Sequence, residues 1–197
     1  MSDPLFDGED DDAATPLTPD EREGLIPSYI TLRRELNEAE QIGIEEADRW
    51  AFSRKRDVLD EQFLKSLHKR TFGQVWRWAG EYRTTARNIG VDAYRIRTEL
   101  HQLLDDVRYW IGHQTFAAAE IAVRFHHRLV AIHPFPNGNG RHARLAADLL
   151  AIQLGLPRFT WGRADLVEPK ITRKAYVAAL RAADAHDFEP LCMFARS

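Results

Sequence analysis

Apolar side chains recur every three or four positions along most of this chain, which is the spacing of one face of an α-helix. The run Thr18-Pro19-Asp20-Glu21 has a capping residue, a proline and two acids, and predicts a helix start. Asn37, with Glu40 three residues later, has the spacing of a second cap. Longer helices are expected over residues 37–56, 60–71, 99–112, 116–132, 141–154, 173–185 and 188–195. In the first of these, Ile42, Ala47, Trp50 and Ala51 are expected to face inward.

The pattern changes between residues 72 and 96, where β-formers are broken by glycines. They include Trp76, Trp78, Tyr82, Thr84, Thr85, Ile89, Val91 and Tyr94. This composition favours a short hairpin or flap lying on a helical body. The sequence therefore predicts an all-α bundle with one small β-hairpin flap.

Composition predicts one domain, residues 18–197, preceded by an acidic tail. The chain has 197 residues, 44% of them hydrophobic, enough for one sizeable core. Residues 1–17 hold six acids and no base, so we expect a mobile tail. No apolar run is long enough to cross a membrane and no leader pattern opens the chain, which predicts a cytoplasmic protein. Cys192 lies among apolar neighbours and is expected to be a buried structural thiol.

Without the tail the chain is slightly basic, which suits an anionic ligand but is too weak a signal for nucleic-acid binding. The chemistry gathers in residues 133–144, HPFPNGNGRHAR, between two helix patterns. Two prolines and two glycines forbid a continuous helix there, and the loop opens a new helix near Gly140. Such a loop directs backbone N–H groups at one point, and Gly138 and Gly140 allow close approach of a phosphate.

Charged and titratable residues complete this loop. Arg141 and Arg144 are three residues apart and can both lean toward one anion. His133 has the ordinary pKa of a base that works near neutral pH. Taken singly, each feature has an ordinary structural explanation. Their conjunction within twelve residues favours phosphoryl or nucleotidyl transfer.

The segment resembles the signature of the Fic family, H-P-F-x-[D/E]-G-N-G-R-x-x-R, and departs from it at one fixed position. Residues 72–83 resemble the lead-in to the family's flap, and residues 173–191 its closing helices. The resemblance covers about residues 25–195 and is greatest to the bacterial "mobile mystery protein B" branch. It implies a Fic-fold adenylyltransferase that moves AMP from ATP, with Mg²⁺, onto a Tyr, Ser or Thr hydroxyl of a target protein.

The resemblance also implies a role for each matched residue. His133 would deprotonate the target hydroxyl, and Gly138, Asn139 and Gly140 would cradle the phosphates. Arg141 would hold the β/γ end and Arg144 the γ-phosphate. Asn137 is the departure, since it stands where the family supplies an acid to Mg²⁺, and an amide brings no charge to that cation. Gly140 argues against a phosphorylating subgroup that has lysine there.

The flap would bind the target segment as an added β-strand, or would serve as mere cover. Its expected contact residues are Thr85, Arg87, Asn88, Ile89, Gly90, Val91 and Tyr94.

Many family members carry an inhibitory helix reading [S/T]-x-x-x-E-[G/N]. Thr31 and Glu35 match that spacing within residues 28–37, although Leu36 follows where Gly or Asn is expected. The hypothesis is that Glu35 pairs with Arg144 and blocks the γ-phosphate site. The target could be the chain itself, and an antitoxin or a second copy is compatible with the resemblance.

Other functions compete with this one. A silent nucleotide-binding interaction module and a phosphodiesterase that removes AMP would use the same site. A zinc enzyme built on His126, His127, His133 and His142 lacks a zinc-binding spacing. The five tryptophans are expected in the core, with one stacking on adenine as the alternative.

Overall fold

A computed structural model describes residues 18–162 and 169–197, which form helices joined by short loops. The elements are α1 (Pro19–Arg22), α2 (Arg33–Phe52), α3 (Glu61–Phe72), η1 (Ala93–Arg95), α4 (Ile96–His113), α5 (Ala118–Ile132), α6 (Asn139–Gln153), α7 (Pro169–Asp184) and α8 (Glu189–Arg196). The predicted acidic tail, residues 1–17, lies outside the described residues.

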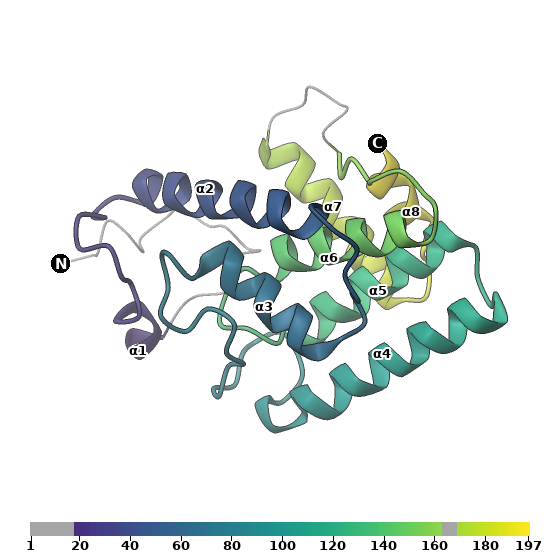
Figure 1. Cartoon of the computed structure of the whole chain (residues 1–197), viewed down its shortest axis with the longest axis horizontal. Coiled ribbons are helices and arrows are strands. Elements are labelled where there is room, and N and C mark those ends of the chain that lie inside the picture. Colours follow the sequence, from purple (N-terminus) through teal and green to yellow (C-terminus); the bar gives the residue numbers. More distant parts are fainter. Residues whose placement is uncertain (1–17, 163–168) are drawn as a thin grey trace.

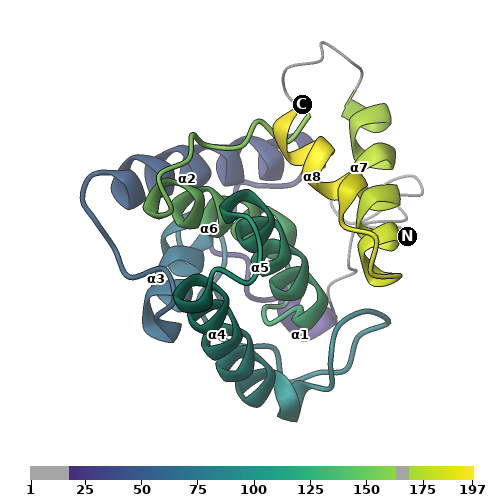
Figure 2. The same cartoon turned by 90° about the vertical axis from the view of Figure 1, so that its right-hand side faces the viewer.

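The helices surround a central pair, α5 and α6 (Figures 1 and 2). Helix α4 packs on α5, helices α2 and α3 pack on each other, and α3 also reaches α6. Helices α7 and α8 form a second pair at the end of the chain, and α8 contacts α5. The all-α bundle is confirmed, and its central pair holds the loop of residues 133–138 between two rigid helices.

Two clusters of buried apolar side chains hold these helices together. The larger one includes Leu64, Leu67, Leu100, Leu103, Phe125, Leu129, Leu150 and Leu191, and Cys192 is buried in it as predicted. The smaller one joins Ile30 and Leu36 to Phe72, Val75, Trp76 and Ala79. Each fully buried side chain of this size contributes about 1.5–3 kcal/mol. The smaller cluster fastens the N-terminal elements beside the site.

Capping residues set the helix starts. Thr18 and Glu21 form a capping box at α1, as their spacing predicts. Asp60 accepts the Phe63 N–H at 2.7 Å and begins α3. The predicted cap at Asn37 is wrong, because α2 begins four residues earlier at Arg33. Glu35 makes this earlier start favourable by accepting the N–H groups of Thr31 and Leu32.

The inward face of α2 also differs from the prediction at one position. Ile42 is 61% exposed, whereas Ala47 and Ala51 are buried. Gly43 takes the inward place, since a Cβ there would lie 2.2 Å from the carbonyl oxygen of Thr71 on α3. Close packing of two backbones therefore decides the rotation of α2.

The predicted β-hairpin is absent from the described residues, in which the only β-type pairing is an isolated bridge between Leu25 and Trp76. Residues 81–92 are instead bends and irregular backbone. The physical reason is that carbonyls which a strand ladder would need, those of Thr85 and Val91, accept hydrogen bonds from the Arg83 side chain. The flap is present as an irregular loop.

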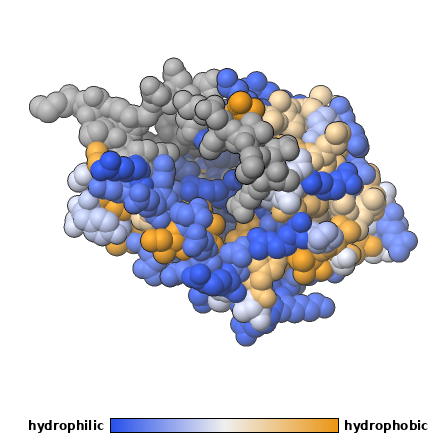
Figure 3. All heavy atoms as spheres, turned by 90° about the horizontal axis from the view of Figure 1, so that it is seen from above, coloured by the Kyte–Doolittle hydropathy of each residue, from blue (hydrophilic) through white to orange (hydrophobic). Residues whose placement is uncertain are grey.

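No helix in residues 18–162 and 169–197 combines the length and apolarity of a membrane span. The space-filling view shows hydrophilic residues over much of the face seen from above, on the side of α2, with larger hydrophobic patches toward the other end (Figure 3).

Candidate active site

The loop between α5 and α6 is shaped by two residues in the left-handed backbone region. His133 ends α5 with φ of 53°, and Gly138 precedes α6 with φ of 76°. Helix α6 begins at Asn139, two residues earlier than predicted, and its first backbone bond runs from the His142 N–H to the Gly138 carbonyl. The N–H groups of residues 139–141 have no acceptor within the helix and face its N-terminal opening. A helix opening of this kind is suited to binding an anion.

Side-chain hydrogen bonds make the loop rigid. The Asn139 amide accepts the Phe135 N–H at 2.9 Å and donates to the Phe135 carbonyl at 2.8 Å. The side chain of Asn139 is therefore used within the loop, which leaves its backbone N–H for an anion. Phe135 in turn stacks on the imidazole of His68, with ring centroids 3.7 Å apart.

His68 on α3 is a supporting residue that sequence analysis missed. Its Nδ1 accepts the Gly80 N–H at 3.0 Å, so the proton is on Nε2, which donates to the Asn137 carbonyl at 3.0 Å. Burial, with nearby positive charge, holds the pKa of His68 well below its usual range, so it is neutral. No local motif marks it, because its partners lie far away in the sequence.

The two glycines of the loop, Gly138 and Gly140, differ in the space that a side chain would have. A Cβ on Gly138 would lie 2.5 Å from the Phe72 ring, whereas one on Gly140 would meet only the Tyr176 hydroxyl at 3.6 Å. The fold itself therefore requires Gly138. Gly140 leaves space that the protein does not fill, which a bound ligand could use.

Gly138→Ala is accordingly expected to lower the free energy of unfolding by at least about 1–2 kcal/mol, the cost of a left-handed backbone for an L-residue. The ring contact adds to that cost. Gly140→Ala is the matched control and should be neutral or stabilising, because alanine is the better helix former. Denaturant titrations of both variants check this, and equal stabilities would contradict it.

His133 lies at the mouth of the loop, 6% exposed. Burial, with the positive charges of Arg83 and Arg87, lowers its pKa to about 4, and a hydrogen bond with the Val130 carbonyl only partly opposes this. The imidazole is therefore neutral at pH 7 and has a lone pair for a proton. Gly90 of the flap packs on it, since a Cβ there would lie 2.6 Å from the His133 Cβ. The structure thus brings flap and histidine together.

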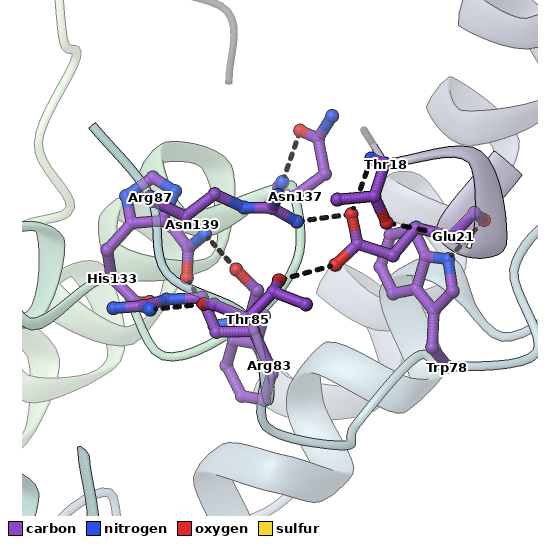
Figure 4. A network of polar contacts seen from close by, with 11 residues as sticks. Thr18, Glu21, Trp78, Arg83, Thr85, Arg87, His133, Asn137 and Asn139 are labelled. Carbon is purple, nitrogen blue, oxygen red and sulfur yellow. Dashed lines mark hydrogen bonds and ion pairs between the residues drawn. The ribbon is translucent and has the colours of Figure 1, made fainter. Parts of the chain in front are cut away.

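Arg83 joins the flap to this loop, a role that sequence analysis missed. Its guanidinium donates to the carbonyls of His133 at 2.7 Å and Thr85 at 2.9 Å (Figure 4). It also donates to the carbonyl of Ile132 at 3.4 Å and to that of Val91. Its backbone N–H donates to the Pro134 carbonyl at 3.0 Å. The residue is 3% exposed. One cation thus fixes both ends of the flap against the end of α5, where unpaired carbonyls favour positive charge.

Arg83→Ala is expected to loosen the flap and to lower stability by about 1.5–3 kcal/mol, the contribution of hydrogen bonds from a charged group. Hydrogen exchange of the amides in residues 84–92 should accelerate by at least about tenfold. Arg77→Ala, at an exposed position in the same region, is the control. If flap exchange is unchanged in Arg83→Ala, Arg83 does not hold the flap.

The other predicted flap residues are placed as follows. Arg87 makes an ion pair with Glu21 of α1, and its side chain is 5% exposed (Figure 4). Asn88 and Ile89 are exposed at the tip. The Val91 N–H donates to the Ile132 carbonyl at 3.3 Å. Tyr94, in η1, is 82% exposed.

The two arginines of the motif have different neighbours. Arg141 makes an ion pair of 2.6 Å with Glu40 of α2 and lies over the Phe72 ring. Arg144 lies over the ring of Tyr176 on α7. Glu40 is 6% exposed and also accepts the Trp76 indole N–H at 2.8 Å. The sequence did not single out Glu40.

Glu35, expected to reach Arg144, is a helix-capping residue in this structure. Its Oε2 accepts the N–H groups of Thr31 at 2.8 Å and Leu32 at 3.0 Å. These backbone bonds lower its pKa. The α2 carboxylate that the structure places on an arginine of the loop is Glu40, on Arg141. The two glutamates are five residues apart, so they cannot share a helix face.

Asn137 is a poor metal ligand as placed. Its Oδ1 already accepts the Gly138 N–H at 2.6 Å. Residues 18–162 and 169–197 contain no group of three or more His, Cys, Asp or Glu side chains suited to a metal ion. Mg²⁺ prefers charged oxygen ligands. The residues present therefore do not fit a tightly held Mg²⁺ ion, and a metal arriving on phosphates would gain one neutral oxygen.

The other three histidines considered as zinc ligands are bound to separate partners. His126 meets the Tyr176 hydroxyl at 3.1 Å, His127 meets Asp184 at 2.8 Å, and His142 donates to the Leu64 carbonyl at 3.0 Å. Burial lowers the pKa of His126 to about 3 and that of His142 to about 4. His126 and His142 therefore act as neutral interhelical hydrogen-bonding groups.

Comparison with known proteins supports the resemblance that the sequence motif indicates. Over 169 residues the chain is 30% identical to protein adenylyltransferase fic-1 of Caenorhabditis elegans, across 82% of this chain and 32% of that protein. It is 29% identical over 144 residues to protein adenylyltransferase Fic of Drosophila melanogaster, across 71% of this chain and 28% of that protein. The chain thus spans about a third of the length of the curated relatives it matches.

Solved structures agree in fold. Fic-1 of C. elegans, residues 134–508, superposes with a TM-score of 0.66 at 26% identity, over 88% of this chain and 51% of that one. The BepC protein of Bartonella tribocorum with bound AMPPNP gives 0.67 at 20% identity, over 91% and 97%. Residues 58–151, which include the flap and the loop from His133 to Arg144, match the model of the Fic/DOC family. The part of the chain that holds the flap and this loop is therefore similar to the Fic/DOC family.

Proposed function

We propose that this protein transfers AMP from ATP to a Tyr, Ser or Thr hydroxyl of a target protein. The observation that carries the proposal is the neutral, buried His133 beside an N-terminal helix opening that holds Gly140 and Arg141. The relatives named above as protein adenylyltransferases support it. The chain itself is one candidate target.

In this reaction the target oxygen attacks the α-phosphorus and the bond to the β-phosphate oxygen breaks, so pyrophosphate leaves. His133 takes the hydroxyl proton, which its neutral state permits. The N–H groups of residues 139–141 stabilise charge on the phosphates, with Arg141 and Arg144 at the β/γ end. The exposed flap tip, Asn88 and Ile89, offers backbone to the target segment.

The test is incubation of the full chain, alone and with cell lysate, with ATP labelled at the α-phosphate or at the γ-phosphate. Label on protein from the α-position only is the expected result. Label from the γ-position would show phosphorylation instead. Label from neither position in the wild type and in Glu40→Gln, which removes the ion pair with Arg141, would overturn the proposal if ATP binding is intact.

Autoinhibition is part of the proposal, with Glu40 as the inhibitory group. The Glu40 carboxylate forms an ion pair with Arg141, whose guanidinium a nucleotide would need. The Trp76 indole N–H donates to the same carboxylate and holds it in place. Glu40→Gln keeps an acceptor for the indole but removes the charge. We expect about a three- to tenfold rise in ATP affinity, because charge-assisted bonds exceed neutral ones by about 1 kcal/mol. Glu38→Gln, on the exposed side of α2, is the control. Calorimetric titration checks it, and unchanged affinity would contradict it.

A second candidate is a catalytically silent nucleotide-binding module. The neutral Asn137 and the Glu40–Arg141 ion pair favour it, since both weaken a metal–nucleotide complex. Pyrophosphate release by Glu40→Gln would exclude it.

A further inference from the structure

We propose that Arg87 of the flap binds the α-phosphoryl group of the nucleotide and supplies positive charge that a metal supplies less well here. Glu21 of α1 is then its counter-ion in the nucleotide-free protein. This inference rests on the proposed function and assigns a further binding residue to the same site.

The position of Arg87 is the first argument. Its side chain is 5% exposed and extends from beside His133 toward Glu21 (Figure 4). The guanidinium is close enough to His133 for its charge to help lower the pKa of the imidazole. The base must lie next to the hydroxyl and the phosphorus that it attacks. A cation beside the base is therefore beside the reacting phosphoryl group.

The hydrogen bonding of Arg87 is the second argument. Glu21 takes one Nη group, while the buried Nε has no acceptor within the described part of the chain. A buried donor without an acceptor is costly, so such groups point to a missing partner. Phosphoryl oxygens match the planar fork of a guanidinium and can use Nε and Nη together. The phosphate thus explains the unused donor.

The replaceable nature of Glu21 is the third argument. It belongs to a helix of four residues, none of them buried. Its carboxylate also accepts from the Thr18 N–H at 2.9 Å and from the Thr85 hydroxyl at 3.4 Å. Arg87 could leave Glu21 without uncovering the main core, and the carboxylate would keep these two bonds. A polyphosphate carries more charge than one carboxylate and would compete well.

The charge balance of the loop is the fourth argument. The loop itself carries no acid, because Asn137 is neutral. Glu21 and Glu40, both from the N-terminal elements, each neutralise one arginine, Arg87 and Arg141. An acid at position 137 would add a further negative charge near these cations. Asparagine there leaves Arg87 free to stabilise charge developing on the phosphoryl oxygens.

Binding of α,β-methylene-ATP, which cannot transfer AMP, tests the inference in EDTA and in Mg²⁺. Wild type is expected to bind in EDTA within about threefold of its affinity in Mg²⁺. In EDTA, Arg87→Ala should lose about tenfold or more, and Arg87→Lys less, since lysine keeps charge but not the fork. Glu21→Gln should bind about threefold tighter or more. Arg87→Ala should also weaken binding of AMP but leave inorganic pyrophosphate unaffected.

The matched controls are Arg95→Ala and Glu99→Gln, which remove an ion pair between η1 and α4, the elements that follow the flap in the chain. They should bind nucleotide as wild type does, and melting temperatures of all variants show that they fold. Nucleotide affinity of Arg87→Ala within twofold of wild type overturns the inference. A defect of Arg87→Ala that appears only in the KM for the target also overturns it, because Arg87 would then bind the target and not the nucleotide. If the wild-type chain neither binds nucleotide nor transfers AMP, the proposed function itself is wrong.

Discussion

Replacing His133 by asparagine is expected to slow AMP transfer by about 10²- to 10⁴-fold while nucleotide binding stays within about twofold. The imidazole takes the proton of the attacking hydroxyl and touches no phosphate in the proposed mechanism. Asparagine is the sharper substitution than alanine, because His133 has a positive φ of 53° and asparagine tolerates that backbone region. A loss of rate in His133→Asn therefore reports the missing base and not a strained loop.

The pH dependence of kcat/KM gives a second readout of the same residue. Since the pKa of His133 is lowered to about 4, kcat/KM in the wild type should stay flat as pH falls from 8 to about 5. A histidine of ordinary pKa would begin to protonate near 6.5. An acid limb centred near 6.5, or a His133→Asn variant with more than about a tenth of the wild-type rate, would rule out this role.

Below pH about 6.5 the protein is expected to lose stability steeply, because four buried histidines stay neutral in the fold. They are His68, His126, His133 and His142, and burial is the main cause of every lowered pKa. Between pH 6.5 and about 4 the unfolded chain binds more protons than the folded one. The free energy of unfolding therefore decreases as the pH is lowered through this range. Each histidine contributes up to about 1.4 kcal/mol per pH unit.

Urea titrations at pH 7.5, 6.5, 5.5 and 4.5 measure this slope. His142→Gln keeps a donor for the Leu64 carbonyl and should reduce the slope by about one proton. Asp148, whose pKa burial raises, acts in the opposite direction at the acidic end. A wild-type slope no steeper than that of His142→Gln would contradict the expectation.

The order of the helices and the loop that carries the chemistry could be predicted, since both depend on local spacing. The 3.6-residue period located α3 to α8 within a few residues, and the loop's glycines and arginines indicated an anion site. The branch of the family stays a prediction. So do the acidic tail and the cytoplasmic location.

The supporting contacts could not be predicted, because they join residues far apart in the chain. His68 reaches Asn137 across 69 positions, Arg83 reaches His133 across 50, and Glu40 reaches Arg141 across 101. The choice of Glu40 over Glu35 depends on the rotation of α2, which the contact of Gly43 with Thr71 sets. A motif spacing along one helix carries no information about that rotation.

The sequence by itself determined the helical bundle, the position of the anion loop and the identity of its histidine and arginines, because those follow from neighbouring residues. Only the tertiary structure decided that His133 is neutral, that the flap is an irregular loop clamped by Arg83, and that Glu21 and Glu40 neutralise Arg87 and Arg141. Burial and the pairing of charges are properties of the packed chain, and they arise when distant segments meet.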